Sequence, residues 1–168
     1  MQFISSDTNV WIDFDTIHKT ELPFRLPYIY IMSKDAIEDE LLSPPGLGKK
    51  LISYGLMPVD ITIDEFVLAE QYGIACTKLS NYDRIALAIA KSRNITLLTG
   101  DFALREAAKQ EKVPILETLG ILDKFWEQRL IAADELRICL HRLLDNNGRA
   151  VRLPKQEILS RLEHLAEN

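Results

Sequence analysis

Cysteine and histidine are scarce in this chain of 168 residues, which contains two of the first and three of the second. Cys76 and Cys139 stand far apart without the paired spacing of a metal site, so we expect two buried free thiols rather than a disulfide. The histidines lie at positions 18, 141 and 164 and are not grouped. This scarcity argues against thiolate metal sites and against histidine-based catalysis.

Long hydrophobic runs are also missing. No apolar segment approaches the roughly 20 residues of a membrane span, and the N-terminus has no signal-peptide pattern, so we expect a cytoplasmic protein without membrane contact. The formal net charge is −5. An acidic chain does not suit surface-wide binding of nucleic acid, although a basic rim around a local acidic site remains compatible with it.

The pattern that is present alternates short apolar strands with helices. The chain has the length of one domain. The expected strands are Phe3–Ser6, Tyr28–Met32, Met57–Ile61, Ile95–Thr99 and Val113–Leu116. Such alternation predicts an α/β fold, with a parallel sheet of about five strands and helices on both faces. From Leu119 onward the pattern is helical only, which predicts a C-terminal extension that packs on the sheet or on a partner.

The other elements are expected to be organised around the segment Leu79–Lys112. Its residues Ile85–Ala90 are all apolar, which predicts a fully buried helix. A short strand follows, Gly100 ends it, and Asp101 begins the next helix. An earlier helix is expected to begin after Thr62 and to stop at Gly73.

Three aspartates lie where the backbone turns. Asp7 and Asp101 each follow a strand, and Asp83 begins the buried helix three residues after Ser80. Taken singly, each is explained by helix capping, Asp83 as part of a capping box with Ser80. If the first and fourth strands are neighbours, however, the three carboxylates converge at one edge and repel one another unless a cation neutralises them. Oxygen ligands without histidine or cysteine favour Mg²⁺ or Mn²⁺.

A fourth acid is expected from the helix after the second strand. Glu40 is the first choice because helical spacing holds it near the sheet, and Glu38 is the reserve. Asn9 and Thr99 stand two residues from Asp7 and Asp101, where they suit the positioning of a carboxylate or a water. Each is equally explained as a helix cap or a strand-end hydroxyl.

These residues carry a resemblance to PIN-domain ribonucleases. It rests on SSDTNVWIDF, LSNYDRIALAIA and LLTGDFALREAA, with a weaker match in the helix that contains Glu40. The resemblance covers roughly residues 2–116 and implies a PIN-like catalytic domain at 1–118 with a helical extension at 119–168. The tail segments TLGILDKF and RLPKQEI also resemble the VapC-type toxins of VapBC toxin–antitoxin pairs.

The resemblance implies an endoribonuclease that hydrolyses RNA with Mg²⁺ or Mn²⁺. The metal-binding and catalytic acids would be Asp7, Glu40, Asp83 and Asp101, with Asn9 and Thr99 in support. Gly100 departs from the pattern, since many relatives have a second aspartate there. Basic residues near the acidic edge, Arg105 and Lys109, are expected to contact the RNA backbone from an outward helix face.

Two further expectations concern partners and an alternative function. Apolar faces around Phe125/Trp126 and Leu140/Leu144 exceed what a small sheet needs, which predicts a homodimer that also binds a small antitoxin protein. The alternative is a PIN scaffold that binds RNA or protein with little or no catalysis, for which Gly100 leaves some room. A receiver-like phosphoacceptor domain fits poorly, because its acidic and basic strand-end residues are not in place.

Overall fold

The structure, a computed structural model, describes residues 1–167. In this range five parallel strands form one sheet in the order β3-β2-β1-β4-β5. The strands are β1 (Gln2–Ser6), β2 (Tyr28–Ser33), β3 (Met57–Val59), β4 (Thr96–Leu98) and β5 (Ile115–Leu116). The predicted α/β fold with a parallel sheet is confirmed. The chain runs outward from β1 to β3 and then returns to β4 on the other side of β1, so the strand order reverses between β1 and β4.

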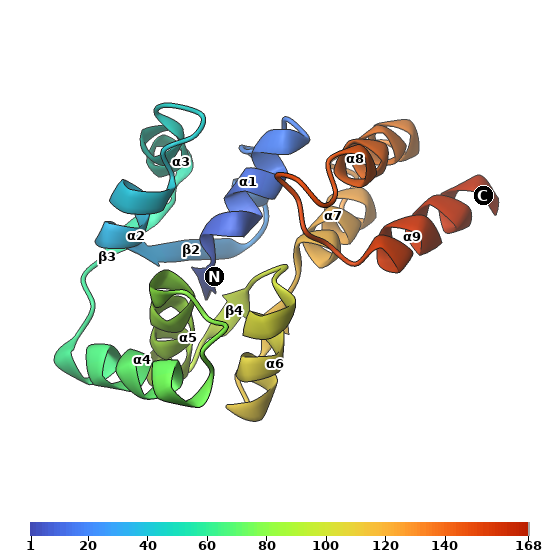
Figure 1. Cartoon of the computed structure of the whole chain (residues 1–168). Coiled ribbons are helices and arrows are strands. Elements are labelled where there is room, and N and C mark those ends of the chain that lie inside the picture. The colour runs from blue at the N-terminus through green and yellow to red at the C-terminus, as the bar shows by residue number, and fades with distance from the viewer. Residues whose placement is uncertain (168) are drawn as a thin grey trace.

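Helices cover both faces of the sheet (Figure 1). Those before β4 are α1 (Thr8–Thr16), α2 (Lys34–Glu40), α3 (Leu47–Tyr54), α4 (Ile63–Ala75) and α5 (Asn81–Arg93), with a short 3-10 helix at Leu22–Arg25. Those after β4 are α6 (Phe102–Gln110), α7 (Thr118–Glu127), α8 (Ala133–Asp145) and α9 (Lys155–Glu167). No helix among residues 1–167 has both the length and the apolar character that a membrane crossing needs.

Two hydrophobic clusters hold the layers together, because successive strand residues point to opposite faces. Tyr30 and Met32 of β2 join the cluster beneath α1, α2, α3 and α7, whereas Ile31 joins the cluster beneath α4, α5 and α6. Leu98 and Leu97 of β4 divide in the same way. The result is a layer of helices on each side of the sheet.

Helix α5 lies in Leu79–Lys112, the segment around which the fold was expected to be organised. All of Ile85–Ala90 is buried, as predicted for a helix that is apolar on every side. Ser80 and Asp83 form a reciprocal capping box at the start of α5. The helix ends at Asn94, which adopts the left-handed conformation typical of helix C-termini.

One local prediction is wrong, and one helix was missed. Helix α4 does not stop at Gly73 but continues to Ala75. A Cβ at Gly73 would lie 1.9 Å from Nη1 of Arg84, so this glycine makes room for a side chain of α5 rather than ending the helix. Helix α3, Leu47–Tyr54, was not predicted, because the prolines and glycine before it indicate a loop.

The C-terminal helices pack against the first helix of the chain. The rings of Phe14 in α1 and Phe125 in α7 lie 5.9 Å apart between centroids. Phe125 and Leu140 are fully buried, and Trp126 and Leu144 are partly buried against the same cluster. The apolar faces from which a dimer was predicted are therefore covered in large part within the chain itself. The proposed division at residues 118/119 stays a prediction.

Candidate active site

Asp7 and Asp101 lie at the carboxyl ends of adjacent strands. Ser6 of β1 pairs with Leu98 of β4, and the amide of Asp7 donates to the carbonyl of Leu98 at 2.9 Å. This is the point where the strand order reverses, and ligands of open α/β sheets bind at such points. The sheet therefore brings together two aspartates that are far apart in the sequence.

Thr99 joins these two strand ends by hydrogen bonds. Its hydroxyl donates to Oδ2 of Asp7 at 3.0 Å and accepts from the backbone amide of Asp101 at 3.1 Å. Thr99 is fully buried, so water does not compete for these contacts. The predicted supporting residue thus fixes the orientation of the Asp7 carboxylate.

The Asp7 carboxylate is buried without a cationic partner. Only 4% of the residue is exposed, and no ion pair to it is formed by residues 1–167. Burial, together with the charges of Asp83 and Asp101, raises its pKa from 3.8 to about 8, although Thr99 and the nearby amide of Asn9 oppose the rise. The carboxylate makes no well-formed capping hydrogen bond to α1. Capping therefore does not explain why an aspartate is buried here.

Asp83 and Glu40 extend the acidic edge from two other helices. Burial is the main cause that raises the pKa of Asp83, and the charge of Asp101 adds to it. Glu40 accepts a hydrogen bond from the Thr8 hydroxyl at 2.7 Å, and burial followed by the charge of Asp83 raises its pKa. Glu38 is exposed, so the position of Glu40 favours it as the fourth acid.

Asp101 and Asp83 cap helices and still face this edge. Oδ1 of Asp101 accepts from the Leu104 amide at 2.9 Å, and Oδ2 of Asp83 accepts from the Ser80 amide at 2.9 Å. Each capping bond engages one carboxylate oxygen and leaves the other with free lone pairs. Capping and cation binding are therefore compatible at both positions.

The chemical type of the donor atoms at this edge suits a hard divalent cation. All donors are carboxylate, hydroxyl or amide oxygens, as Mg²⁺ and Mn²⁺ prefer. Within residues 1–167, no three His, Cys, Asp or Glu side chains form a ready-made metal site. The charges of Asp83 and Asp101 raise the pKa of Asp7, and the charge of Asp83 raises the pKa of Glu40. A cation would have to draw these carboxylates together.

The two predicted RNA-binding residues differ in their surroundings. The guanidinium of Arg105 forms an ion pair with Glu117 at 2.7 Å, and its side chain is only 17% exposed. Lys109 lies exposed near the end of α6. The pairing with Glu117 competes with a phosphate contact by Arg105. A substrate-binding role for either residue stays a prediction.

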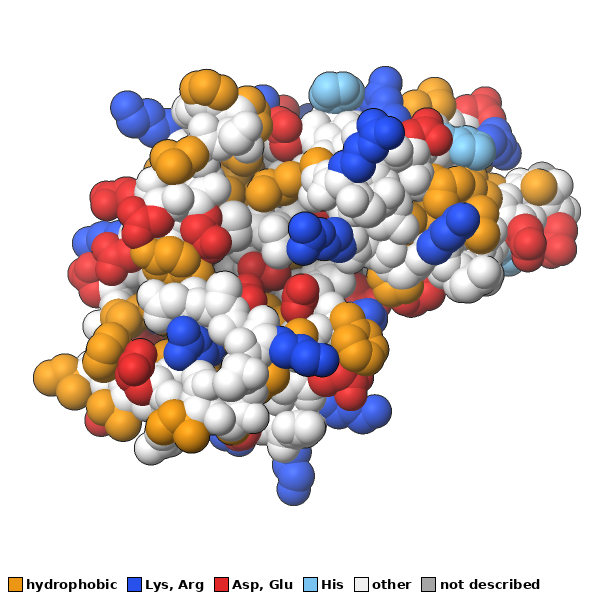
Figure 2. Space-filling model, in the orientation of Figure 1, with side chains coloured by type: hydrophobic (Ala, Val, Ile, Leu, Met, Phe, Trp, Pro, Cys, Tyr) orange, Lys and Arg blue, Asp and Glu red, His pale blue; other side chains and the backbone are white. Residues whose placement is uncertain are grey.

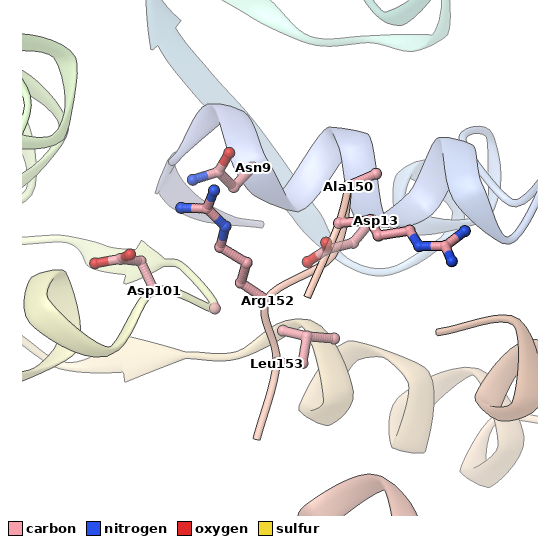
Figure 3. A pocket seen from close by; sticks show the side chains of 8 residues that line it. Asn9, Asp13, Asp101, Ala150, Arg152 and Leu153 are labelled. Atoms are coloured by element: carbon pink, nitrogen blue, oxygen red, sulfur yellow. The ribbon is translucent and has the colours of Figure 1, made fainter. Parts of the chain in front are cut away.

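Residues that were not predicted complete the surroundings of this edge. A cavity of about 220 Å³ is lined by Asn9, Asp13, Asp101, Arg149, Arg152 and Leu153 among others (Figure 3). Asp13 lies one helical turn after Asn9, is 3% exposed and accepts from the Thr118 hydroxyl at 2.9 Å. Burial raises its pKa to about 7. The i, i+4 spacing of Asn9 and Asp13 was the available signal, whereas nothing local placed the arginines here.

Leu153 also accounts for the glycine at position 100. A Cβ on Gly100 would lie 2.6 Å from Cδ2 of Leu153 and 3.4 Å from the Thr118 hydroxyl oxygen. A second aspartate after Thr99 would therefore require the Leu153 side chain, from the loop between α8 and α9, to shift. In this chain the loop occupies the space that an acidic side chain would need.

Figure 2 shows acidic side chains in a hollow near the middle of this face, with Lys or Arg side chains around it. A local acidic site with basic surroundings is thus present on a molecule of net negative charge.

Comparison with known proteins agrees with this geometry. A family model described as a PIN domain matches residues 3–166, which includes the sheet, the acidic edge and the C-terminal helices. No curated protein and no solved structure matches the chain. Since the family match spans nearly the whole sequence, the chain belongs to the PIN-domain family, whose members are generally nucleases.

Proposed function

We propose that this protein is an endoribonuclease that hydrolyses RNA phosphodiester bonds with Mg²⁺ or Mn²⁺. The observation that carries the proposal is the buried Asp7 carboxylate, which lacks a cationic partner and lies beside Asp101 and Asp83 at the strand switch point. Leaving such a group uncompensated is costly, because close like charges and burial both disfavour ionisation. A bound divalent cation would remove that cost.

Each acidic residue has a defined part in the proposed site. Asp7, Asp83, Asp101 and Glu40 would hold the cation, and Thr99 keeps Asp7 aimed at it by a hydrogen bond. When bound, Mg²⁺ or Mn²⁺ activates the attacking water and stabilises the leaving oxygen. Asn9 is exposed in the cavity beside Asp101, where its amide can orient substrate or water. The expected products carry a 5′-phosphate and a 3′-hydroxyl.

A cleavage assay tests this proposal. Purified protein is incubated with a fluorescent single-stranded RNA across a titration of Mn²⁺, and the end groups of the products are identified. Cleavage that requires Mn²⁺, leaves 5′-phosphates and is lost in Asp7→Asn supports the proposal. RNA binding without metal-dependent cleavage would instead favour the scaffold alternative.

We further propose that the protein is the toxin of a type II toxin–antitoxin pair and acts as a homodimer. Support comes from the resemblance of the tail to VapC-type toxins and from exposed apolar side chains on α4, where Ile63, Phe66 and Ile74 are 82%, 52% and 85% exposed. Sedimentation should show a dimer that Phe66→Glu weakens, and the protein should co-purify with the product of an adjacent small gene. Monomer alone at micromolar concentration would contradict the dimer.

A further inference from the structure

The loop between α8 and α9 holds Arg152 in a defined position. The Asn147 side chain donates to the Leu153 carbonyl and accepts from the Leu153 amide, both at 3.0 Å. The Gly148 amide donates to the Val151 carbonyl at 2.8 Å. Val151 is fully buried and Leu153 is 7% exposed, so both sides of Arg152 are anchored in the core. Because neighbouring residues of an extended segment point to opposite sides, Arg152 points away from that core.

Arg152 points toward the acidic edge. In Figure 3 its guanidinium extends to the space between Asn9 and Asp101. Among residues 1–167 this guanidinium makes no ion pair and no hydrogen bond. An arginine whose backbone is anchored and whose guanidinium is unpaired can bind an anion without first breaking an ion pair.

Two adjoining cavities meet at this side chain. The first contains Asn9 and Asp101, and a second cavity of about 640 Å³ contains Phe102 and Arg105. Gly100, Arg152 and Leu153 line both. The ring of Phe102 is 69% exposed, and the Arg105 guanidinium lies 5.9 Å from its centroid. Phe102 therefore lines the same cavity as the unpaired Arg152. An exposed aromatic ring and a free arginine in one cavity suit a single strand, through base stacking and a phosphate contact.

We propose that the α8–α9 loop forms a subsite for single-stranded RNA, in which Arg152 binds a backbone phosphate next to the carboxylates and Phe102 stacks on a base. This inference rests on the proposed ribonuclease function and names how that site holds its substrate. Arg152 is a substrate-binding residue that the chain supplies from its own tail. Its Leu153 neighbour fixes the loop by packing on Gly100.

Binding of a short fluorescein-labelled single-stranded RNA to the full-length Asp7→Asn protein, measured by anisotropy in Mg²⁺, tests the subsite. Adding Arg152→Gln should weaken binding about tenfold, because a charge-assisted hydrogen bond to phosphate is lost. It should also reduce the slope of log affinity against log salt by about 0.7. Arg152→Lys should retain that slope while recovering only part of the affinity, since lysine keeps the charge and loses the fork geometry.

The matched control is Arg142→Gln, which removes the same charge from an exposed position of α8 that lines neither cavity. Equal weakening by Arg142→Gln and Arg152→Gln would overturn the subsite, as would RNA binding that Arg152→Gln leaves unchanged or strengthens. Wild-type cleavage is measured separately. A protein that binds RNA through Arg152 and never cuts it would refute the nuclease and retain the subsite.

Discussion

Leu153 occupies the space that a side chain at position 100 would need. A Cβ on Gly100 would lie 2.6 Å from Cδ2 of Leu153, well inside van der Waals contact. The C-terminal loop is thereby joined to the end of β4, one residue before Asp101. A side chain at position 100 and the present position of Leu153 are therefore incompatible.

Gly100→Ala tests this contact. We expect a loss of about 1–3 kcal/mol in the free energy of unfolding, because the added methyl overpacks a filled site. Leu153→Ala alone should cost about 2–5 kcal/mol by leaving a cavity. In the double variant the two losses should be less than additive, since each change relieves the other. Urea unfolding of the four proteins measures the coupling, and strict additivity would show that the two residues do not compete for space.

Phe102 should contribute to RNA affinity but should contribute little to the free energy of unfolding. Its ring is 69% exposed at the start of α6, so Phe102→Ala removes few core contacts. Loss of stacking on one base should weaken RNA binding by about 1–3 kcal/mol. Phe3→Ala on β1, where the ring is 43% exposed at the amino end of the strand, is the matched control and should leave RNA affinity unchanged. A similar loss in both variants would indicate a general effect of removing exposed aromatic area.

Arg93 should be important for folding. Its guanidinium contacts both carboxylate oxygens of Glu65, at 2.9 and 3.0 Å, and the Glu65 side chain is 1% exposed. Burial raises the pKa of Glu65, and the contacts with Arg93 and the Thr62 cap outweigh burial, so the pKa is lowered overall.

Arg93→Met would leave the Glu65 carboxylate buried and unpaired, so we expect a loss of about 3 kcal/mol in urea unfolding. The control is Arg137→Met, which breaks an exposed pair with Asp134 and should cost less than about 1 kcal/mol. Similar losses in the two variants would show that the Glu65 pair is solvated after all.

Stability in EDTA should fall as the pH rises. The pKa of Asp7 is 3.8 in the unfolded chain and about 8 in the folded one, mainly because of burial and then because of Asp83 and Asp101. Between these values the folded state binds more protons than the unfolded state, so the free energy of unfolding decreases with pH and levels off above about 8. Asp7→Asn should flatten this slope in part, since the raised pKa of Asp13 contributes in the same direction. A slope equal to that of the wild type would contradict the burial of an ionisable Asp7.

Much of the fold follows from local sequence signals. Apolar β-branched runs such as Tyr28–Met32 predict strands, and the six apolar residues Ile85–Ala90 predict the buried helix, because their burial requires no knowledge of distant contacts. Gly73 was misread for the opposite reason. Its local signal is a helix stop, and the reason for the glycine is the Arg84 side chain of another helix.

The same distinction applies to the site. The alternating pattern places Asp7 and Asp101 after strands and Asp83 at the start of a helix. Their convergence depends on β1 and β4 being neighbours, which the sequence left as a condition and the structure shows. The position of Arg152 depends on a loop that returns to the sheet only after two further helices, so no local pattern reveals it. The hydrogen bond between Thr118 and Asp13 likewise joins residues 105 positions apart, so no local pattern predicts it.

The central claim is that Asp7 holds a divalent cation, and melting of wild type and Asp7→Asn in EDTA and in Mn²⁺ tests it most directly. In EDTA above about pH 8, where Asp7 is ionised, the variant should melt higher, because one buried charge is removed from a repelling cluster while the asparagine oxygen can still accept from Thr99. In Mn²⁺ the wild type should gain stability by mass action and the variant far less. Equal gains in the two proteins on adding Mn²⁺ would contradict the claim and remove Asp7 from the metal site.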